Sequence, residues 1–201
     1  MNKVDEIYKN SDSIQEYCEL YFKYLNKVLT SISLSEIERF TTTLLNARDR
    51  GAKIYFIGNG GSAATSSHFA NDLAIGTREY DKPFKVVSLC DNNAILTAIG
   101  NDNGFDSIFS QQLQVLLNKG DVVVAISASG NSVNLLKAFD VAKQKGAITV
   151  GLSAFDGGKL KIEADISVHV PTGKSEYGPA EDAHMVLDHL VSNYLMRFIK
   201  I

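Results

Sequence analysis

Residues 53–62 read KIYFIGNGGS and residues 121–132 read DVVVAISASGNS, and these two stretches decide the fold. Each begins with a short apolar, β-rich run and continues into a loop of glycines and small polar residues. A segment with helical spacing follows each loop. Strands that are buried on both faces of a parallel sheet have this continuous apolar texture. The two stretches therefore predict parallel strands, each followed by a helix.

Three more apolar runs, at residues 85–90, 147–153 and 165–171, bring the expected strands to five. Because helical segments separate most of them, we expect an α/β fold, a three-layer α/β/α sandwich with a largely parallel sheet. Asp91 is expected to cap the helix after the second strand, and residues 62–76 and 179–200 are each expected to form one continuous helix.

Two amphipathic helices are expected before the first strand. Residues 11–30 carry apolar side chains at helical spacing, and a second such segment ends at Gly51. Ser35 is the favoured N-cap of this second helix, since Glu38 would complete a capping box, and Ser33 is the less favoured choice. We expect residues 1–51 to form a helical extension of the same domain as residues 52–201.

Composition and charge limit the function classes. The 201 residues are 45% apolar and 21% charged, which is typical of a globular domain with a buried core. A net charge of -3 without a long basic run predicts neither a nucleic-acid nor a membrane partner. The polar start, the short apolar runs and two cysteines far apart, Cys18 and Cys90, favour a cytoplasmic location.

Two loops are expected to carry the chemistry, because ligands of open parallel sheets bind beyond the carboxyl ends of the strands. The first, residues 58–62, has three glycines that let a ligand approach the backbone. The second, residues 127–132, places three hydroxyl groups at the start of a helix, where backbone amides favour an anion. Hydroxyl groups without a lysine favour a phosphate monoester. One capping residue would suffice for an ordinary helix start.

A dinucleotide site is the alternative for the first loop, because Gly58, Gly60 and Ala63 match G-x-G-x-x-A. That motif alone is weakly specific. Asp91 lies late for the acidic partner of the motif, and the serine-rich loop has no role in it. We therefore rank the dinucleotide reading below a sugar-phosphate site.

Imidazole and carboxylate groups cluster in two of the expected helices. His68 and Asp72 lie four positions apart, about one turn along a helix face. In the last helix Glu181, Asp182, His184, Asp188 and His189 fall within nine positions. Such sets can supply an acid, a base or a metal site, and their spacing alone leaves these alternatives open.

Four stretches together resemble the SIS (sugar isomerase) domain family, in particular its phosphoheptose isomerase branch. They read FIGNGGSAATSSHFANDL, AIGNDNGFDSIFSQQL, AISASGNSVNLLKAFDVAKQKG and EDAHMVLDH. The resemblance implies a five-stranded parallel sheet of flavodoxin-like type and a homotetramer with active sites between subunits. It also implies the interconversion of a ketose phosphate and an aldose phosphate, most specifically sedoheptulose 7-phosphate and D-glycero-D-manno-heptose 7-phosphate.

The resemblance also assigns roles to residues. It makes Asp72 the general base and His189 the second acid/base group, and it implies a Zn²⁺ ion held by His68, Asp72, Glu181 and His189. The substrate-binding residues that it implies are Asn59, Gly60, Gly61, Ser62, Asn101, Asp102, Ser127, Ala128, Ser129, Ser132 and Glu181.

Three residues depart from the family pattern. Asp72 stands where the family has glutamate, which shifts the carboxylate by roughly 1.5 Å, and misplacement of that order can cost ~100-fold in rate. Glu181 replaces a glutamine, and Ala128 replaces a threonine. By helical geometry alone, Asp182 shares the face of His189 more closely than Glu181 does.

A rival hypothesis is a non-catalytic SIS-domain protein that binds a phosphosugar or a replication initiator. A pure binding protein would not need His68, Asp72 and His189 in two helices, so these residues favour catalysis.

Overall fold

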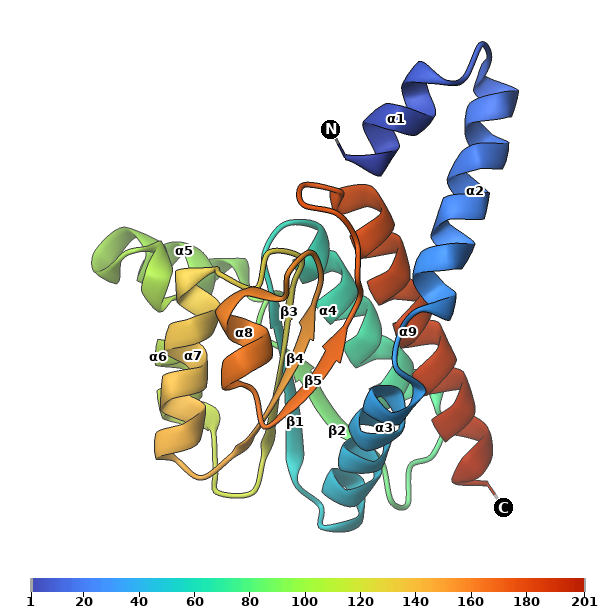
Figure 1. Ribbon diagram of the computed structural model, residues 1–201. Helices are drawn as coiled ribbons and strands as arrows, with labels where there is room; N and C mark the ends of the chain where they lie inside the picture. The colour runs from blue at the N-terminus through green and yellow to red at the C-terminus, as the bar shows by residue number, and fades with distance from the viewer. Residues whose placement is uncertain (1, 201) are drawn as a thin grey trace.

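A five-stranded sheet forms the centre of the molecule, and all of its strands are parallel (Figure 1). The computed structural model describes residues 2–200. The strands are β1 (Lys53–Gly58), β2 (Lys85–Ser88), β3 (Val122–Ser127), β4 (Ile148–Ser153) and β5 (Ile166–His169). Their order across the sheet, β2-β1-β3-β4-β5, is the flavodoxin-like order. The predicted α/β fold with five parallel strands is confirmed.

Helices cover both faces of the sheet, because the strands alternate their apolar side chains between the two sides. In β1, Ile54 and Phe56 face a core shared with helices α3 (Leu34–Asp49), α4 (Gly61–Asn71) and α9 (Tyr177–Phe198). Tyr55 and Ile57 face a second core with α6 (Ser110–Leu116), α7 (Val133–Gln144) and α8 (Gly158–Glu163). A period of two residues along each strand thus produces the three layers.

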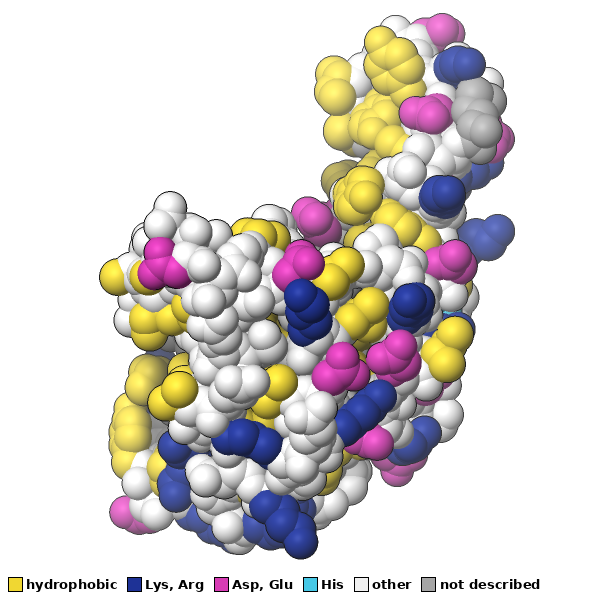
Figure 2. All heavy atoms as spheres, turned by 90° about the vertical axis from the view of Figure 1, so that its left-hand side faces the viewer, with side chains coloured by type: hydrophobic (Ala, Val, Ile, Leu, Met, Phe, Trp, Pro, Cys, Tyr) yellow, Lys and Arg dark blue, Asp and Glu magenta, His cyan; other side chains and the backbone are white. Residues whose placement is uncertain are grey.

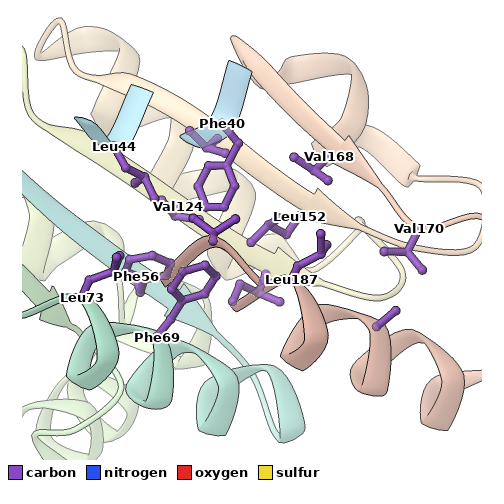
Figure 3. Packing of buried hydrophobic residues seen from close by; sticks show 14 of the residues in the cluster. Phe40, Leu44, Phe56, Phe69, Leu73, Val124, Leu152, Val168, Val170 and Leu187 are labelled. Carbon is purple, nitrogen blue, oxygen red and sulfur yellow. The ribbon is translucent and has the colours of Figure 1, made fainter. Parts of the chain in front are cut away.

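Aromatic stacking fixes α4 on the first face of the sheet. Phe69 of α4 stacks on Phe56 of β1 with ring centroids 4.7 Å apart, and Phe40 of α3 meets Phe69 edge to face. Figure 3 shows Leu187 of α9 pointing into the same cluster from the neighbouring helix. The position of α4 relative to α9 therefore follows from buried apolar contacts.

The N-terminal helices form an arm that projects from the body (Figure 1). The arm consists of α1 (Lys3–Lys9) and α2 (Ile14–Thr30), and of the residues of α2 only Val28 is buried. Large side chains remain exposed on it, among them Tyr8, Ile14 and Phe22, and Figure 2 shows hydrophobic side chains gathered on this arm. Helix α1 was not expected from the sequence, because its short polar segment lacks a clear apolar stripe.

Two capping predictions were wrong. Ser33 caps α3, since its extended backbone lets its hydroxyl accept the Glu36 amide at 3.3 Å, and Ser35 lies inside the first turn. Asn92 caps α5 (Asn93–Asn103) by accepting the Ile95 amide at 3.1 Å. Asp91 instead accepts a hydrogen bond from the Ser67 hydroxyl. In both cases the true cap is the residue immediately before the helical backbone begins.

The expected helix over residues 62–76 changes character part-way. Helix α4 ends at Asn71, and Asp72–Gly76 form a π-helical turn, η1. Such turns often mark functional positions in helices. A 3₁₀ turn, η2 (Phe105–Ser107), follows α5. Within residues 2–200, no helix combines the length and the apolar character needed to cross a bilayer.

Candidate active site

Two glycines of the loop after β1 lie too close to neighbouring atoms for a side chain, and the third has a left-handed backbone. A Cβ at Gly58 would lie 2.5 Å from the Ser62 carbonyl oxygen, and Gly60 has a φ of +54°. A Cβ at Gly61 would overlap the carboxylate of Glu181. These glycines therefore let the chain turn directly from β1 into α4 and bring Glu181 of α9 against the start of that helix.

The serine-rich loop after β3 is held by its own hydroxyl groups and by a neighbouring turn. The Ser127 hydroxyl accepts the Gly130 amide at 3.1 Å, and the Ser129 hydroxyl lies 3.4 Å from the Asn131 amide. Ser132 is the N-cap residue of α7, and its own hydroxyl makes no capping hydrogen bond within the described chain. The first turn of α7 therefore keeps amide donors for an anion.

Backbone contacts anchor the remainder of this loop. The buried Ala128 accepts the Ala154 amide at 3.1 Å, and the Gly130 carbonyl accepts the Leu160 amide at 2.9 Å. Gly130 has a φ of +63° and packs against Gly157, so the backbone of the loop is constrained at this position. Such preorganisation suits a binding loop.

A pair of asparagines ties the two loops together. Asn59 of the glycine loop and Asn134 of α7 exchange side-chain hydrogen bonds of 3.0 and 2.8 Å. Asn134 is buried and was not among the predicted site residues. The Asn59 amide thus positions the glycine loop against the helix that follows the serine loop.

Two histidines and a carboxylate converge where α4 meets α9. His68 and His189 are 121 positions apart in sequence, yet their Nε2 atoms lie 3.1 Å apart, with the rings edge to face. The Asp72 Oδ2 lies 3.6 Å from the His68 Nε2. The structure therefore brings together three of the four residues that the resemblance assigns to a metal.

A second carboxylate, Asp188, completes this cluster from inside the protein. Ligand atoms of His68, Asp72, Asp188 and His189 all lie within 4.8 Å of one another. Asp188 is fully buried, and neither of its carboxylate oxygens has a hydrogen-bond partner among the described residues. Burial, and to a smaller extent the charge of Asp72, raises the pKa of Asp188 to about 8.

The structure places the other predicted site residues elsewhere. Glu181 lies against Gly61, and its position eight residues before His189 corresponds to about 12 Å along α9. Asp182 is exposed and accepts a hydrogen bond of 2.6 Å from Tyr21. Asn101 and Asp102 bond to each other at 2.8 Å on the exposed end of α5. None of these four joins the cluster within the described chain.

The spacing of acids and histidines in the sequence does not single out Asp188. It lies one position after Leu187 and three before Val191, both of which are buried on the inner face of α9. An acid within such an apolar stripe is expensive to bury without a partner. Its place within the apolar stripe of α9, and not the number of acids nearby, therefore distinguishes the buried Asp188 from the exposed Asp182.

Comparison with known proteins decides the family. Residues 17–154 match the SIS domain family. The phosphoheptose isomerase of Geobacter metallireducens is 41% identical over 155 residues, which cover 77% of this chain and 81% of that protein. This chain belongs to the phosphoheptose isomerase branch of the SIS-domain family. The resemblance noted in the sequence is thereby confirmed.

Solved structures of phosphoheptose isomerases share the fold. The enzyme from Neisseria gonorrhoeae superposes with a TM-score of 0.82 at 30% identity and covers 91% of this chain and 98% of its own. The enzyme from Francisella tularensis has a TM-score of 0.83 at 23% identity, with 92% and 99% covered, and supports the fold alone.

The cluster of this phosphoheptose isomerase relative fits a divalent metal ion. Two imidazole nitrogens and two carboxylates are common ligands of zinc. The orphaned oxygens of the buried Asp188 supply the structural test, because a buried carboxylate without a partner is stabilised by a bound cation. The residues present therefore suit the ion that the resemblance implies.

Proposed function

We propose that this protein is an aldose–ketose isomerase that converts sedoheptulose 7-phosphate to D-glycero-D-manno-heptose 7-phosphate in the cytoplasm. The observation that carries the proposal is the convergence of His68, Asp72 and His189 on one point. A carboxylate beside imidazoles can move protons between carbon and oxygen, whereas a phosphosugar-binding protein has no need of it.

The serine loop would hold the phosphate end of the open-chain sugar. Ser129 and Ser132 offer hydroxyl groups, Ser127 shapes the loop, and the amides at the start of α7 face the anion. Gly60 and Gly61 would line the sugar with backbone amides, and Ser62, whose amide donates to the Asn59 carbonyl, would contact it through its side chain. Fixing the distant phosphate orients the carbonyl end for reaction.

Proton transfer would begin at Asp72. Its carboxylate takes a proton from C1 of the ketose, and the electrons of the broken C–H bond form a cis-enediolate. His189 moves a proton between the oxygens on C1 and C2, and return of a proton to C2 gives the aldose. Amide donors of the glycine loop would stabilise the developing negative charge on oxygen.

His68, Asp72 and His189 would also hold a Zn²⁺ ion. When bound, such an ion polarises the substrate carbonyl as a Lewis acid. Glu181, which lies against Gly61, would contact the sugar rather than the ion in the same chain. Asn101 and Asp102 remain proposed substrate contacts. They lie on α5, outside the cluster of His68, Asp72 and His189, so α5 would have to approach the substrate from another side.

We further propose that the active site forms between subunits of a homotetramer. Asp72 lies eleven positions after Gly61 along one helix, about 16 Å from the glycine loop of its own chain. An apolar groove of about 410 Å³ between α3 and α9 is lined by Leu34, Tyr194 and Phe198, among others. A second copy of the chain would cover such a groove and bring its own loops to the cluster.

The proposal is tested by an isomerisation assay on a panel of hexulose, heptulose and octulose phosphates. Turnover of the heptulose phosphate should fall at least ~100-fold in Asp72→Asn and in His189→Ala. Asp140→Asn, which removes an exposed acid of α7, is the matched control and should keep full activity. Normal turnover in both site variants, or no turnover of any sugar by the wild type, would overturn the proposal.

A further inference from the structure

The ligand set implied by the resemblance leaves one position of the metal site unfilled within a chain. His68, Asp72 and His189 converge, but Glu181 lies about two helical turns away along α9. A zinc ion that acts on a substrate usually has three protein ligands at about 2.0–2.2 Å and one position for water or substrate, and it can expand to five ligands. A fourth protein ligand from the same chain would therefore have to be a group other than Glu181, and the substrate would then take a fifth position.

We propose that Asp188 is the fourth protein ligand of this site, so that a single chain holds the ion with two imidazoles and two carboxylates. This inference rests on one part of the proposed function, namely that the cluster binds a metal ion, and it does not depend on the isomerase activity. Asp188 has 0% exposure, so bulk water does not compensate its carboxylate. Both of its oxygens lack a hydrogen-bond partner within residues 2–200.

The geometry favours coordination over a purely structural role. A carboxylate in the core is normally paired or coordinates a metal. Asp188 reaches the same point as His68, Asp72 and His189, with all four ligand atoms within 4.8 Å of one another. Tetrahedral zinc ligands are separated by about 3.3 Å, so small side-chain movements suffice to close the set.

Two consequences follow. The charges of Asp72 and Asp188 together neutralise a divalent ion, whereas His68, Asp72 and His189 alone supply one negative charge. All four ligands come from α4, η1 and α9 of the same chain. Metal binding should therefore not require a second subunit, even if the substrate site does.

A cysteine substitution tests coordination directly with Co²⁺ as the probe. A thiolate bound to Co²⁺ gives a near-ultraviolet charge-transfer band, and cysteine is a common ligand in such sites. Asp188→Cys should show this band on addition of Co²⁺, and Glu181→Cys, which adds the same thiol two turns away, should not. A band in the second variant and none in the first would overturn the assignment.

Affinity measurements provide a second readout on variants without a new thiol. Asp188→Leu should bind Co²⁺ at least ~100-fold more weakly than the wild type, since loss even of outer-shell partners costs 10–100-fold. Glu181→Gln and Asp140→Asn should keep the wild-type affinity. If Asp188→Leu does not fold, Asp188→Asn replaces it with the same expectation of weaker binding.

These outcomes separate the two proposals. Wild-type Co²⁺ affinity in the Asp188 variants would overturn the ligand assignment, whatever the enzyme's activity. Conversely, a charge-transfer band in Asp188→Cys together with no turnover of any sugar phosphate would overturn the isomerase proposal and support the metal site alone.

Discussion

At Gly130 the serine loop has no room for a side chain. The residue has a φ of +63°, and a Cβ there would overlap the carbonyl oxygen of Gly157. The left-handed backbone alone costs an L-residue roughly 1–2 kcal/mol, and the overlap forces the loop to move. We expect Gly130→Ala to lower the free energy of unfolding by about 3 kcal/mol and to raise KM for the sugar phosphate.

Urea denaturation of Gly120→Ala supplies the control for this prediction. Gly120 has a φ of +85° but no described atom within 4 Å of its added Cβ, so only the backbone strain of about 1 kcal/mol should remain. Equal losses of stability in the two variants would show that contact with Gly157 does not constrain the loop.

His184 makes stability depend on pH. Both ring nitrogens are buried without a hydrogen-bond partner among the described residues, and burial lowers the pKa of His184 to about 4. In the unfolded chain its pKa returns to 6.5, so between pH 6.5 and 4 the unfolded state binds more protons. The folded state should therefore lose up to about 3 kcal/mol as the pH falls through this range.

The variant His184→Leu isolates this contribution. The difference in unfolding free energy between wild type and variant, measured in urea with a chelator present, should shift in favour of the variant between pH 6.5 and 4. Above pH 6.5 His184 is neutral in both states, so the difference between the two proteins should stay nearly constant there. Parallel pH profiles of the two proteins would contradict the assignment of the acid sensitivity to His184.

At the scale of elements, the asparagine pair couples the glycine loop after β1 to α7. Asn59 and Asn134 each satisfy the other's amide, so loss of either leaves a polar group unpaired. We expect Asn59→Ala and Asn134→Ala each to cost about 1–3 kcal/mol. The double variant should cost about 1 kcal/mol less than their sum. A double-mutant cycle in urea measures the coupling energy between the two asparagines. If the losses of unfolding free energy were strictly additive, the two side chains would not stabilise each other.

The exact ends of the helices could not be predicted from local sequence, although the positions of the strands could. Strand positions follow from runs of buried apolar residues, which depend only on the neighbouring residues. Ser33 and Ser35 both satisfy the chemistry of a cap, and only the backbone, extended at Ser33, decides between them. The π-helical turn at Asp72 packs against α9, and no local pattern encodes this contact.

At the scale of the molecule, the two loops could be predicted because parallel strands bring their carboxyl ends to one edge. The cluster could not be derived in the same way, since His68 and His189 meet across two helices that are distant in the chain. Only the family resemblance paired them. Asp188 could not be singled out either, because the density of acids in the sequence does not reveal which acid is buried. The division between residues 1–51 and 52–201 stays a prediction, and the family match begins inside α2.

If the protein is a homotetramer, the apolar groove between α3 and α9 should lie in an interface between subunits. Leu34, at the first position of α3, is 81% exposed and lines this groove. An acid at a helix N-terminus does not disturb the helix, so Leu34→Asp should fold normally and yet weaken association. Light scattering coupled to size exclusion should detect species smaller than a tetramer.

The dissociated variant should lose turnover while it keeps the wild-type affinity for Co²⁺, because all four proposed ligands belong to one chain whereas the substrate site needs two. Ile162→Asp is the matched control: Ile162 is 84% exposed on α8, which covers the opposite face of the sheet. It should leave assembly and activity unchanged. A monomer with full turnover would place the entire active site within one chain, and the 16 Å estimated along α4 would then have to be bridged by the substrate or by movement of the loops.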